Sequence, residues 1–453
     1  MSRSSRLLVV PLAAFVLAVG AATTAAAPKR PSEPFFPRSG NRGYDVEHYD
    51  VSLGYQPRSG MLTARDVVEA RATTGLSRFS LDLDGLKVTS AGVDGEAAEY
   101  GRGRGKVKIV PATPIAKGEA FTVELRYQGV PRKVTDPDGS TEGWYRTEDG
   151  AVAVGEPVGT AAWLACDDAP RDKASLDIQI SVPAGVKAVS NGTLVSRREV
   201  DRRVRWSWSE PRPMASYLAL VDIGKGKLLH GHVGKLPTWT LVDPKLAKAS
   251  RPALDSLPEI IRWESHLYGP YPFAAAGSVV DVARLGYALE TQSRPIYAGA
   301  PDRTTVVHET AHQWFGDSVG LERWPDIWLN EGFATWTQWY FAERHGGRTA
   351  QQVFAELYRT PAAATGFWDP PPGHPGQAKN LFAVSTYVRG TMTLQALRDK
   401  IGTHDLLRVL RTWATEHRYG HGDIEEFVAL VDRVSGGHLR GFFHRWLFER
   451  GKP

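Results

Sequence analysis

The chain has 453 residues, enough for two or three domains that each bury a core of their own. Its composition, 42% hydrophobic and 23% charged, is that of a globular protein and excludes a disordered or fibrous chain. The formal net charge is +5, without a long run of lysine or arginine, which argues against nucleic-acid binding and against electrostatic attachment to a membrane.

The first 27 residues have the order of a secretory signal peptide. Two arginines precede an apolar stretch from 7 to 20, and three alanines follow at 25–27. The apolar stretch is too short to span a bilayer comfortably, which disfavours the alternative of an uncleaved anchor. We therefore expect a signal peptide at 1–27, a flexible lead-in at 28–40, and a secreted or extracytoplasmic protein without stable membrane association after signal removal.

From 41 to 225 the sequence predicts a β-rich domain. Short alternating runs such as 106–110 are separated by glycine, proline and aspartate. Asn191-Gly192 lies between two such runs and is typical of a tight hairpin, which explains it better than glycosylation does. The glycine-rich, basic stretch 101–105 lacks the setting of a phosphate-binding loop, and we interpret it as the tip of another hairpin.

From 226 to 453 the pattern predicts a mainly helical domain. Asp302 is expected to cap a helix through Phe315, and Asp326 a helix that ends near His345. Further helices are expected at 258–267, 387–400, 406–417 and 424–434. Cys166 is the only cysteine, so no internal disulfide can form, and any metal ion must be bound by histidines and carboxylates. We expect Cys166 itself to be a small buried residue and not a nucleophile.

The predicted helix after Asp302 carries an H-E-x-x-H motif at 308–312. Residues four apart lie on one face of a helix, so the imidazoles of His308 and His312 can reach one metal ion. Glu309 is rotated from His308 by about 100°, which places its carboxylate to bind a water molecule on the metal and not the metal itself.

A catalytic zinc ion needs three protein ligands, and Glu331 is the candidate for the third. It lies in WLNEGFA (328–334), an otherwise apolar helix, where a carboxylate is costly unless it is paired or bound to a cation. Gly332 has no side chain, so another backbone can approach closely. The pattern indicates a site for one catalytic zinc ion, against the alternative of two histidines and a glutamate that share a surface helix by coincidence.

These two motifs resemble the gluzincin metallopeptidases of the aminopeptidase N family. The extended strings HQWFG at 312–316 and WLNEG at 328–332 carry the resemblance, and GPYPF at 269–273 adds to it. It covers about 400 residues, from 41 to the end. The resemblance implies an α+β protein, in which an N-terminal β-sandwich or saddle-like domain (41–225) precedes a thermolysin-like, mainly α zinc-peptidase domain (226–453).

The same resemblance implies the remaining site residues. Tyr387, in YVRG, takes the place of the family tyrosine that hydrogen-bonds the developing oxyanion. Glu290, in YALET, takes the place of the glutamate that binds the substrate's α-amino group, and Glu156 that of a second acidic residue from the β domain. Gln338 replaces a family carboxylate, which should matter less because it would not contact the metal.

The implied activity is that of a secreted zinc aminopeptidase acting on peptides, with zinc and Tyr387 on the oxyanion and Glu309 as the base. Tyr287 and Thr291 replace residues that the family keeps, and the family's C-terminal helical domain is expected to be absent, which leaves a zinc endopeptidase open. A non-catalytic zinc-binding module is disfavoured because Glu309 and all three ligands are present. GDSVG (316–320) fits a serine-hydrolase motif, but Ser318 follows the predicted metal helix directly instead of a strand.

Overall fold

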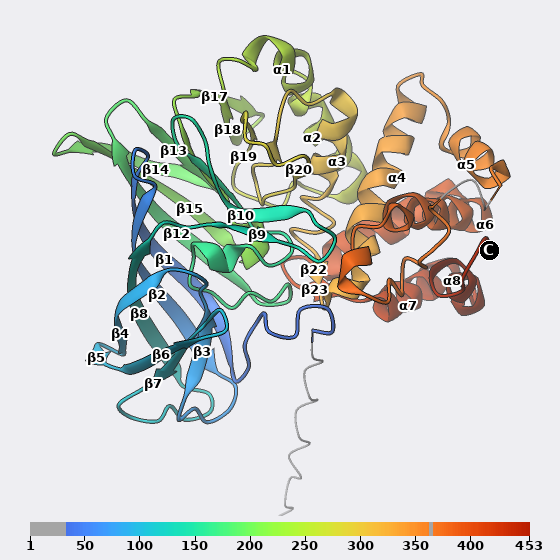
Figure 1. The fold of residues 1–453 in the computed structure, drawn as a ribbon. Coiled ribbons are helices and arrows are strands. Elements are labelled where there is room, and N and C mark those ends of the chain that lie inside the picture. Colours follow the sequence, from blue (N-terminus) through green and yellow to red (C-terminus); the bar gives the residue numbers. More distant parts are fainter. Residues whose placement is uncertain (1–32, 362–365) are drawn as a thin grey trace, which may run out of the picture. The chain divides into compact units, whose positions relative to one another are not determined.

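The expected division into a β-rich part followed by a mainly helical part is confirmed (Figure 1). The computed structural model describes residues 33–361 and 366–453, so the predicted signal peptide at 1–27 lies outside the described residues. Among these residues, no helix is both long enough and apolar enough to span a membrane. The strands β1 to β16 come first in the chain, and α1 to α8 follow them. The predicted boundary near 225 falls between β16 and β17 but stays a prediction.

The largest element of the β part is an eight-stranded sheet in which β1 and β12 pair in parallel and the other neighbours are antiparallel. Along β1, buried Val51, Leu53 and Tyr55 alternate with less buried Ser52 and Gly54, because successive side chains of a strand point to opposite faces. In sheet order the strands are β14 (Thr193–Val200), β15 (Arg203–Ala215), β12 (Lys173–Pro183), β1 (Tyr44–Gln56), β2 (Met61–Ala72), β8 (Ala120–Gly129), β4 (Lys87–Val93) and β5 (Glu96–Ala97).

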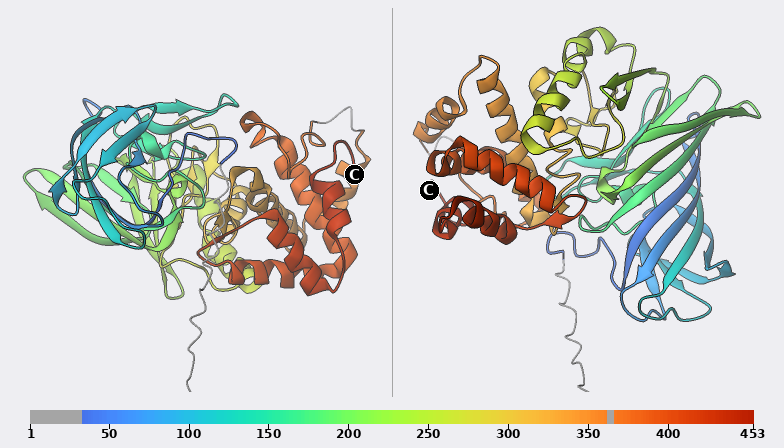
Figure 2. Two further views of the ribbon diagram at one scale, coloured as in Figure 1. Left: turned by 90° about the horizontal axis from the view of Figure 1, so that it is seen from below. Right: turned by 180° about the vertical axis from the view of Figure 1, so that it is seen from behind.

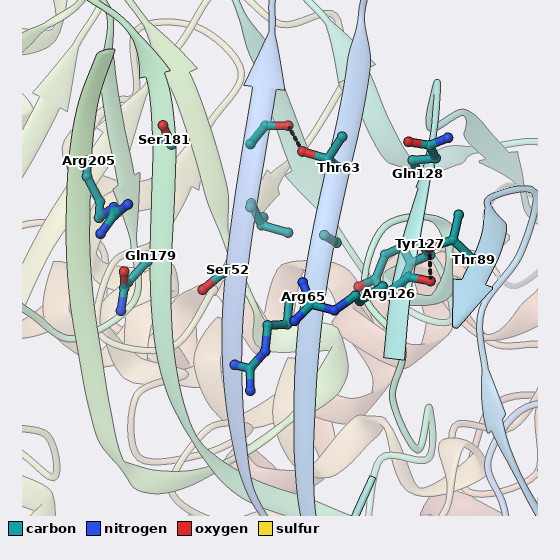
Figure 3. A pocket seen from close by; sticks show the side chains of 13 residues that line it. Ser52, Thr63, Arg65, Thr89, Arg126, Tyr127, Gln128, Gln179, Ser181 and Arg205 are labelled. Carbon is teal, nitrogen blue, oxygen red and sulfur yellow. Dashed lines mark hydrogen bonds between the residues drawn. The ribbon is translucent and has the colours of Figure 1, made fainter. Parts of the chain in front are cut away.

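The outer face of this sheet is polar. It carries a hollow of about 480 Å³ that none of the predicted site residues lines (Figure 3). Its labelled side chains are hydroxyls, amides and guanidinium groups, with Tyr127 as the exception, and they belong to Ser52, Thr63, Arg65, Thr89, Arg126, Gln128, Gln179, Ser181 and Arg205. The apolar side of the sheet therefore forms the core, and the other side faces solvent.

Two smaller sheets complete the β part. A five-stranded sheet consists of β13 (Lys187–Ser190), β16 (Val221–Gly224), β11 (Ala151–Val154), β10 (Thr141–Arg146) and β9 (Lys133–Thr135). A three-stranded sheet consists of β3 (Phe79–Asp82), β7 (Lys106–Val110) and β6 (Glu99–Gly103). The turn between β6 and β7 holds Arg104 and Gly105, both with positive φ, so the hairpin tip expected near 101–105 is confirmed.

The hairpin expected at Asn191-Gly192 is wrong. The strands on either side belong to different sheets, because β13 pairs with β16 and β14 pairs with β15. Asn191 is buried, and its side chain donates to the carbonyl oxygens of Leu218 and Gln292 and accepts from the amide of Leu220. Long-range hydrogen bonds thus decide the turn, and a buried, fully bonded amide excludes a sugar there, as expected.

Among its described residues, the helical part contains a five-stranded sheet, a short two-stranded sheet and eight α-helices. Figure 2 shows their arrangement from two other sides. The sheets consist of β17 (Lys227–Val233), β18 (Leu236–Val242), β19 (Ala276–Val280), β21 (Ile296–Tyr297) and β20 (Ala288–Leu289), and of β22 (Gly320–Leu321) with β23 (His421–Gly422). The helices are α1 (Ala247–Leu254), α2 (Leu257–Tyr268), α3 (Arg303–Ala311), α4 (Trp328–Arg344), α5 (Ala350–Arg359), α6 (Val384–Glu416), α7 (Ile424–Ser435) and α8 (Arg440–Leu447).

The helix boundaries follow the predicted signals with two corrections. Asp302 caps α3 as expected, but the helix ends at Ala311 and not at Phe315. Asp326 is not a helix cap, because it is buried in a 3-10 turn and Ile327 occupies the N-cap of α4. The two helices expected at 387–400 and 406–417 form α6, which is interrupted at Gly402, where φ is 80°.

One lysine joins the β part to the helical part. The Nζ of Lys173, on β12, donates to the carbonyl oxygens of Asp317 at 2.7 Å, Ser318 at 2.9 Å and Gly420 at 3.0 Å. Asp317 and Ser318 lie in the turn that follows α3, and Gly420 lies between α6 and α7. Three acceptors satisfy the three hydrogens of an ammonium group, so this side chain fixes the exit of α3 against the β part.

Candidate metal centre and substrate pocket

Helix α3 places both histidines of the H-E-x-x-H motif. Its first turn is fixed by Asp302, whose Oδ1 accepts a hydrogen bond from the amide of Thr305 at 2.7 Å. His308 lies in the last turn and His312 is the C-cap residue. The centroids of the two imidazole rings are 4.7 Å apart, so both rings lie on one side of the helix, as the spacing predicts.

Helix α4 brings Glu331 to the two histidines. Its Oε2 lies 3.2 Å from His308 Nε2 and 3.5 Å from His312 Nε2. One ligand atom from each of the three side chains falls within 4.8 Å of the other two, in a buried to half-buried setting. The structure therefore brings the three predicted ligands together, and two imidazoles with one carboxylate form a donor set that suits zinc.

Close packing of α4 against α6 places Tyr387. A Cβ added at Gly332 would lie 3.1 Å from the carbonyl carbon of Gly390 and 3.3 Å from its Cα, so the two backbones approach at this point. The close approach expected at Gly332 is confirmed, and Gly390 is its partner. Tyr387 lies one turn before Gly390 on α6, and its ring is stacked on His308 with centroids 6.4 Å apart.

Hydrogen bonds behind the metal centre orient both imidazoles. His312 Nδ1 lies 3.0 Å from the carbonyl oxygen of Phe315, so this nitrogen carries the proton and Nε2 is left to face Glu331. The His308 side chain is hydrogen-bonded to Gln338, the residue that replaces a family carboxylate. Gln338 therefore orients a ligand without itself approaching the metal position.

The two carboxylates of Glu331 and Glu309 differ in their pKa. Burial alone would raise the pKa of Glu331, but the charge of His312 and hydrogen bonds from both histidines hold it at about 2. Burial raises the pKa of Glu309 well above its ordinary value; the charge of His312 opposes this rise, and the nearby Glu290 and Glu331 add to it. Glu331 is thus a charged ligand, whereas Glu309 has the raised proton affinity that suits a general base.

Tyr387 has the properties of a neutral hydrogen-bond donor. Burial raises the pKa of its phenol well above the ordinary value, and the surrounding carboxylates Glu331, Glu156, Glu290 and Glu309 raise it further. The hydroxyl consequently keeps its proton. It lines the same pocket as the three ligands, where it is available to an oxygen that gains negative charge.

Glu290 and Glu156 meet beside the metal centre from opposite parts of the chain. Glu290 follows β20, and its backbone carbonyl accepts from Gln313 Nε2 at 3.0 Å, whereas Glu156 follows β11. Oxygen atoms of Glu156, Glu290 and Glu331 lie within 4.8 Å of one another. Within the described residues, Oε1 of Glu156 and Oε1 of Glu290 are buried without a hydrogen-bond partner. Two such acceptors are costly unless a ligand satisfies them.

All seven predicted site residues line one cavity of about 310 Å³. Sequence reasoning missed three further lining residues, Asp138 and Ser140 from the β9–β10 turn and Phe382 from the segment before α6. Local sequence carries no signal for them, because a turn residue becomes part of a pocket only through the packing of its domain. The cavity is also lined by Tyr287 and Ala288.

The two nucleophile alternatives find no support in the geometry. Ser318 is buried in the turn after α3, where the amide of Asp317 binds the carbonyl of His312, and it does not line the cavity. This turn leaves a helix, whereas the serine-hydrolase motif requires a strand before the serine. Cys166 is buried, as expected, and burial raises the pKa of its thiol well above the ordinary value.

Solved structures with the same fold include zinc metallopeptidases. An M1 zinc metallopeptidase from Deinococcus radiodurans superposes with a TM-score of 0.86 and 28% identity, over 93% of this chain and 97% of that one. A mutant of a Deinococcus radiodurans M1 zinc metallopeptidase was solved with a Tyr-Ser-Ala substrate and matches at 27% identity, over 93% of this chain and 98% of that one, also with a TM-score of 0.86.

The curated relatives include longer proteins. A leucyl aminopeptidase of Saccharolobus solfataricus is 24% identical over 90% of this chain and 54% of its own length. A tricorn protease-interacting factor F2 of Thermoplasma acidophilum is 22% identical over 90% of this chain and 54% of its own length. The chain thus spans about half the length of these relatives. The Peptidase M1 N-terminal domain matches residues 45–218 and the Peptidase family M1 domain matches residues 298–446, so the chain belongs to peptidase family M1.

Proposed function

We propose that this chain is a zinc aminopeptidase, which removes residues one at a time from the N-terminus of peptides. The observation that carries the proposal is the pair of unsatisfied buried oxygens on Glu156 and Glu290, directly beside Glu331. A free α-amino group is largely cationic near neutral pH, and its ammonium hydrogens match these acceptors. The names of the relatives, which include a leucyl aminopeptidase, agree with this proposal.

The donor set fits one zinc ion held by His308, His312 and Glu331. Two other groups of side chains have ligand atoms equally close together. One consists of Glu290, Glu309 and His312, and the other of Glu156, Glu290 and Glu331. They contain one imidazole and none, fewer than the set with both histidines. When bound, zinc supplies a Lewis acid that polarises the scissile carbonyl and lowers the pKa of water.

The chain's own residues then carry out the proton transfers and the positioning. Glu309 accepts the proton of the attacking water and delivers it to the leaving amine, a task that fits its raised pKa. Tyr387 donates its phenolic hydrogen to the oxyanion. Glu290 and Glu156 bind the α-ammonium group, so the first peptide bond is the one presented to Glu309.

An endopeptidase would use the same metal residues, and the difference lies in the space around the α-amine site. Tyr287 stands where the family motif begins with glycine, and its hydroxyl donates to the carbonyl oxygen of Thr141, on β10, at 3.0 Å. The side chain therefore spans from the helical part to the β part and lines the cavity. This replacement narrows the pocket instead of opening it, which favours the exopeptidase.

The test compares one peptide with a free N-terminus and the same peptide acetylated. Acetylation removes the positive charge, so hydrolysis should nearly vanish, and the first residue should be the first product released from the free peptide. Glu290→Gln should weaken hydrolysis of the free peptide. Internal cleavage of the acetylated peptide at a comparable rate would refute the aminopeptidase proposal and leave the metal site intact.

We also propose that the protein is exported and that its signal peptide is removed. The support is the charged, apolar and small-residue order of residues 1–27. Expression of the full chain in a secreting host, followed by N-terminal sequencing of protein from the medium, tests this. Protein that stays with the cells and begins at Met1 would contradict it.

A further inference from the structure

The side of the substrate pocket that the β part forms is called the β wall here and consists of Asp138, Ser140 and Glu156. It carries a carboxylate that the proposed mechanism leaves unused. Of the described residues, five carboxylates line the cavity, and four of them already have proposed roles on the metal, the water or the α-amine. The fifth is Asp138, in the turn between β9 and β10. Among the described residues, no lysine or arginine lines the cavity.

The turn holds Asp138 in a defined place. Its Oδ1 accepts hydrogen bonds from the amide of Ser140 at 2.8 Å and from the Ser140 hydroxyl at 2.6 Å. Oδ2 of the same carboxylate makes none of these bonds. The hairpin is also tied to the helical part, because Thr141 at the start of β10 accepts the hydrogen bond from Tyr287. Asp138 is thus presented by a fixed turn and not by a free loop.

The other charged residues of this hairpin leave the side that faces the pocket negative. Asp136 and Glu142, on the same hairpin, form a buried carboxyl pair, in which burial raises the pKa of Asp136 to about 6 and that of Glu142 well above its usual range. The pair shares a hydrogen bond and does not supply two free charges. Lys133 lies over the ring of Tyr145, 4.6 Å from its centroid, and does not line the cavity. Asp138 is therefore the carboxylate of the hairpin that faces the pocket.

The position of the α-amine site decides which substrate group meets Asp138. The residue that carries the α-amine is the first residue of the peptide, and its side chain leaves the carbon next to that nitrogen. Glu156, one of the two amine ligands, follows β11, which pairs with β10 of the Asp138 hairpin. The cavity beside the α-amine site is lined on this side by Asp138, Tyr287 and Ala288, so these residues are within the space open to the side chain of the first residue.

We propose that Asp138 selects peptides whose first residue is arginine or lysine. The long aliphatic stem of such a residue packs on the ring of Tyr287, and its cationic end reaches the Asp138 carboxylate, where it forms a charge-assisted hydrogen bond. This inference rests on the proposed aminopeptidase function and names its substrate class. Asp138 is a specificity residue, because it acts on the substrate side chain and not on the scissile bond.

The test uses two aminomethylcoumarin amides, one of arginine and one of norleucine, which has an unbranched but uncharged chain. The wild-type protein should hydrolyse the arginine amide with the higher kcat/KM. Asp138→Asn keeps an oxygen that can accept from Ser140 but removes the charge, and it should lower the arginine-to-norleucine ratio of kcat/KM roughly fivefold, as for a partly exposed ion pair. Hydrolysis of the norleucine amide should stay within about twofold of wild type, because it does not use the charge.

Glu148→Gln is the matched control. Glu148 lies in the next turn of the β part, pairs with Lys245 and does not line the cavity, so its removal changes the net charge equally and should leave the ratio unchanged. A measurement without any variant adds to this: raising the salt concentration from roughly 20 to 500 mM should lower the wild-type ratio, because salt screens exposed charge pairs.

The outcomes separate the two proposals. Equal kcat/KM for both amides in the wild-type protein, or an equal loss on both amides in Asp138→Asn, overturns the role of Asp138 while the aminopeptidase proposal stands. A ratio that Glu148→Gln lowers as much as Asp138→Asn overturns it too. If the zinc-loaded protein hydrolyses neither amide and cuts peptides only internally, both proposals fail.

Discussion

The helical wall and the β wall of the pocket hold their functional residues by different means. On the helical wall, His308, Glu309 and His312 belong to α3 or its cap, and Glu331 belongs to α4. On the β wall, Glu156 and Asp138 lie in connections between strands. Helix geometry fixes the spacing of the residues on a helix, whereas the position of a turn depends on what packs around it.

In our proposals, the residues of the helical wall bind the metal ion and transfer the protons, whereas Asp138 on the β wall selects the substrate side chain. A metal ion tolerates little error in the positions of its ligands. The helices of the helical wall hold the ligands in fixed positions. A substrate side chain tolerates more, and loops on a rigid sheet are where such contacts commonly vary. Variants on the two walls should therefore fail in different ways.

Removal of a metal ligand should have the largest effect. His308→Ala and Glu331→Ala each leave two protein ligands, too few for a catalytic zinc, so both variants should lose the metal and all measurable activity. Metal analysis of the purified proteins, with a chelator-treated wild type for comparison, measures this. Glu156→Gln on the β wall is the control and should retain about one zinc per chain. Full occupancy in His308→Ala would show that the ligands are wrongly assigned.

Glu309→Gln should separate metal binding from proton transfer on the helical wall itself. The amide has the shape of the carboxylate but cannot accept the water proton, so turnover should fall by about 100- to 10,000-fold with the zinc content unchanged. Steady-state kinetics together with metal analysis test this. Turnover near the wild-type value would remove Glu309 from the role of base.

Tyr387→Phe should reduce turnover somewhat less than Glu309→Gln does. The change keeps the ring beside His308 but deletes the donor to the oxyanion, and kcat should fall by about 100- to 1,000-fold with a much smaller change in KM. The separation of kcat from KM distinguishes this role from one in packing. A variant within about threefold of wild type would mean that the tyrosine is structural.

A pair of glycines tests how tightly the helical wall is packed. Gly332→Ala would place a Cβ 3.1 Å from the Gly390 backbone, so α4 and α6 must separate, and we expect a loss of roughly 1–3 kcal/mol of unfolding free energy. Gly390→Ala meets its nearest atom at 3.4 Å and should be close to neutral, since alanine favours a helix. Denaturant unfolding compares them. Equal stability of the two variants would contradict the close approach of these backbones.

The pH dependence of stability tests the connection that Lys173 makes between the β part and the helical part. Burial lowers the pKa of Lys173 from its usual range to about 7, an effect that Asp317 partly opposes. Between about pH 7 and pH 10 the unfolded chain then binds more protons at this lysine than the folded chain does, so Lys173 makes stability rise with pH. The free-energy cost of burying the charged lysine is fully present below pH 7, and it decreases as the pH rises above 7.

Unfolding free energies of wild type and Lys173→Met, measured at pH 7 and pH 9, isolate this contribution. The unfolding free energy of wild type should increase relative to that of Lys173→Met as the pH rises, by at most about 1.4 kcal/mol per pH unit. A difference that stays constant would mean that the three carbonyl acceptors keep the lysine at its ordinary pKa.

Several features of this protein follow from its sequence alone. The H-E-x-x-H spacing places two imidazoles on one helix face in any fold that keeps the helix, and Glu331 stands out because a carboxylate is costly in an apolar helix. The cap at Asp302 and the break near Gly402 are likewise local, because they depend on neighbouring backbone groups. Tyr387, Glu290 and Glu156 were found by resemblance and not by local chemistry.

Other features were decided by the tertiary structure. Asn191-Gly192 has the local preference of a hairpin, but three long-range hydrogen bonds to Asn191 direct its flanking strands into different sheets. Asp326 has the preference of a helix cap, but it is buried in a turn. In both cases the free energy of a local motif is about 1 kcal/mol, which the packing of two sheets or two helices readily exceeds.

The pocket itself shows the same division. The metal ligands are separated by at most 23 residues and are ordered by two successive helices, so the sequence determines them. Asp138 and Tyr287 approach the pocket from points 149 residues apart and meet only because the β9–β10 hairpin docks on β20 through the Thr141 bond. Contacts between distant segments depend on how whole domains pack, and that packing is the sum of many weak interactions that no short motif contains.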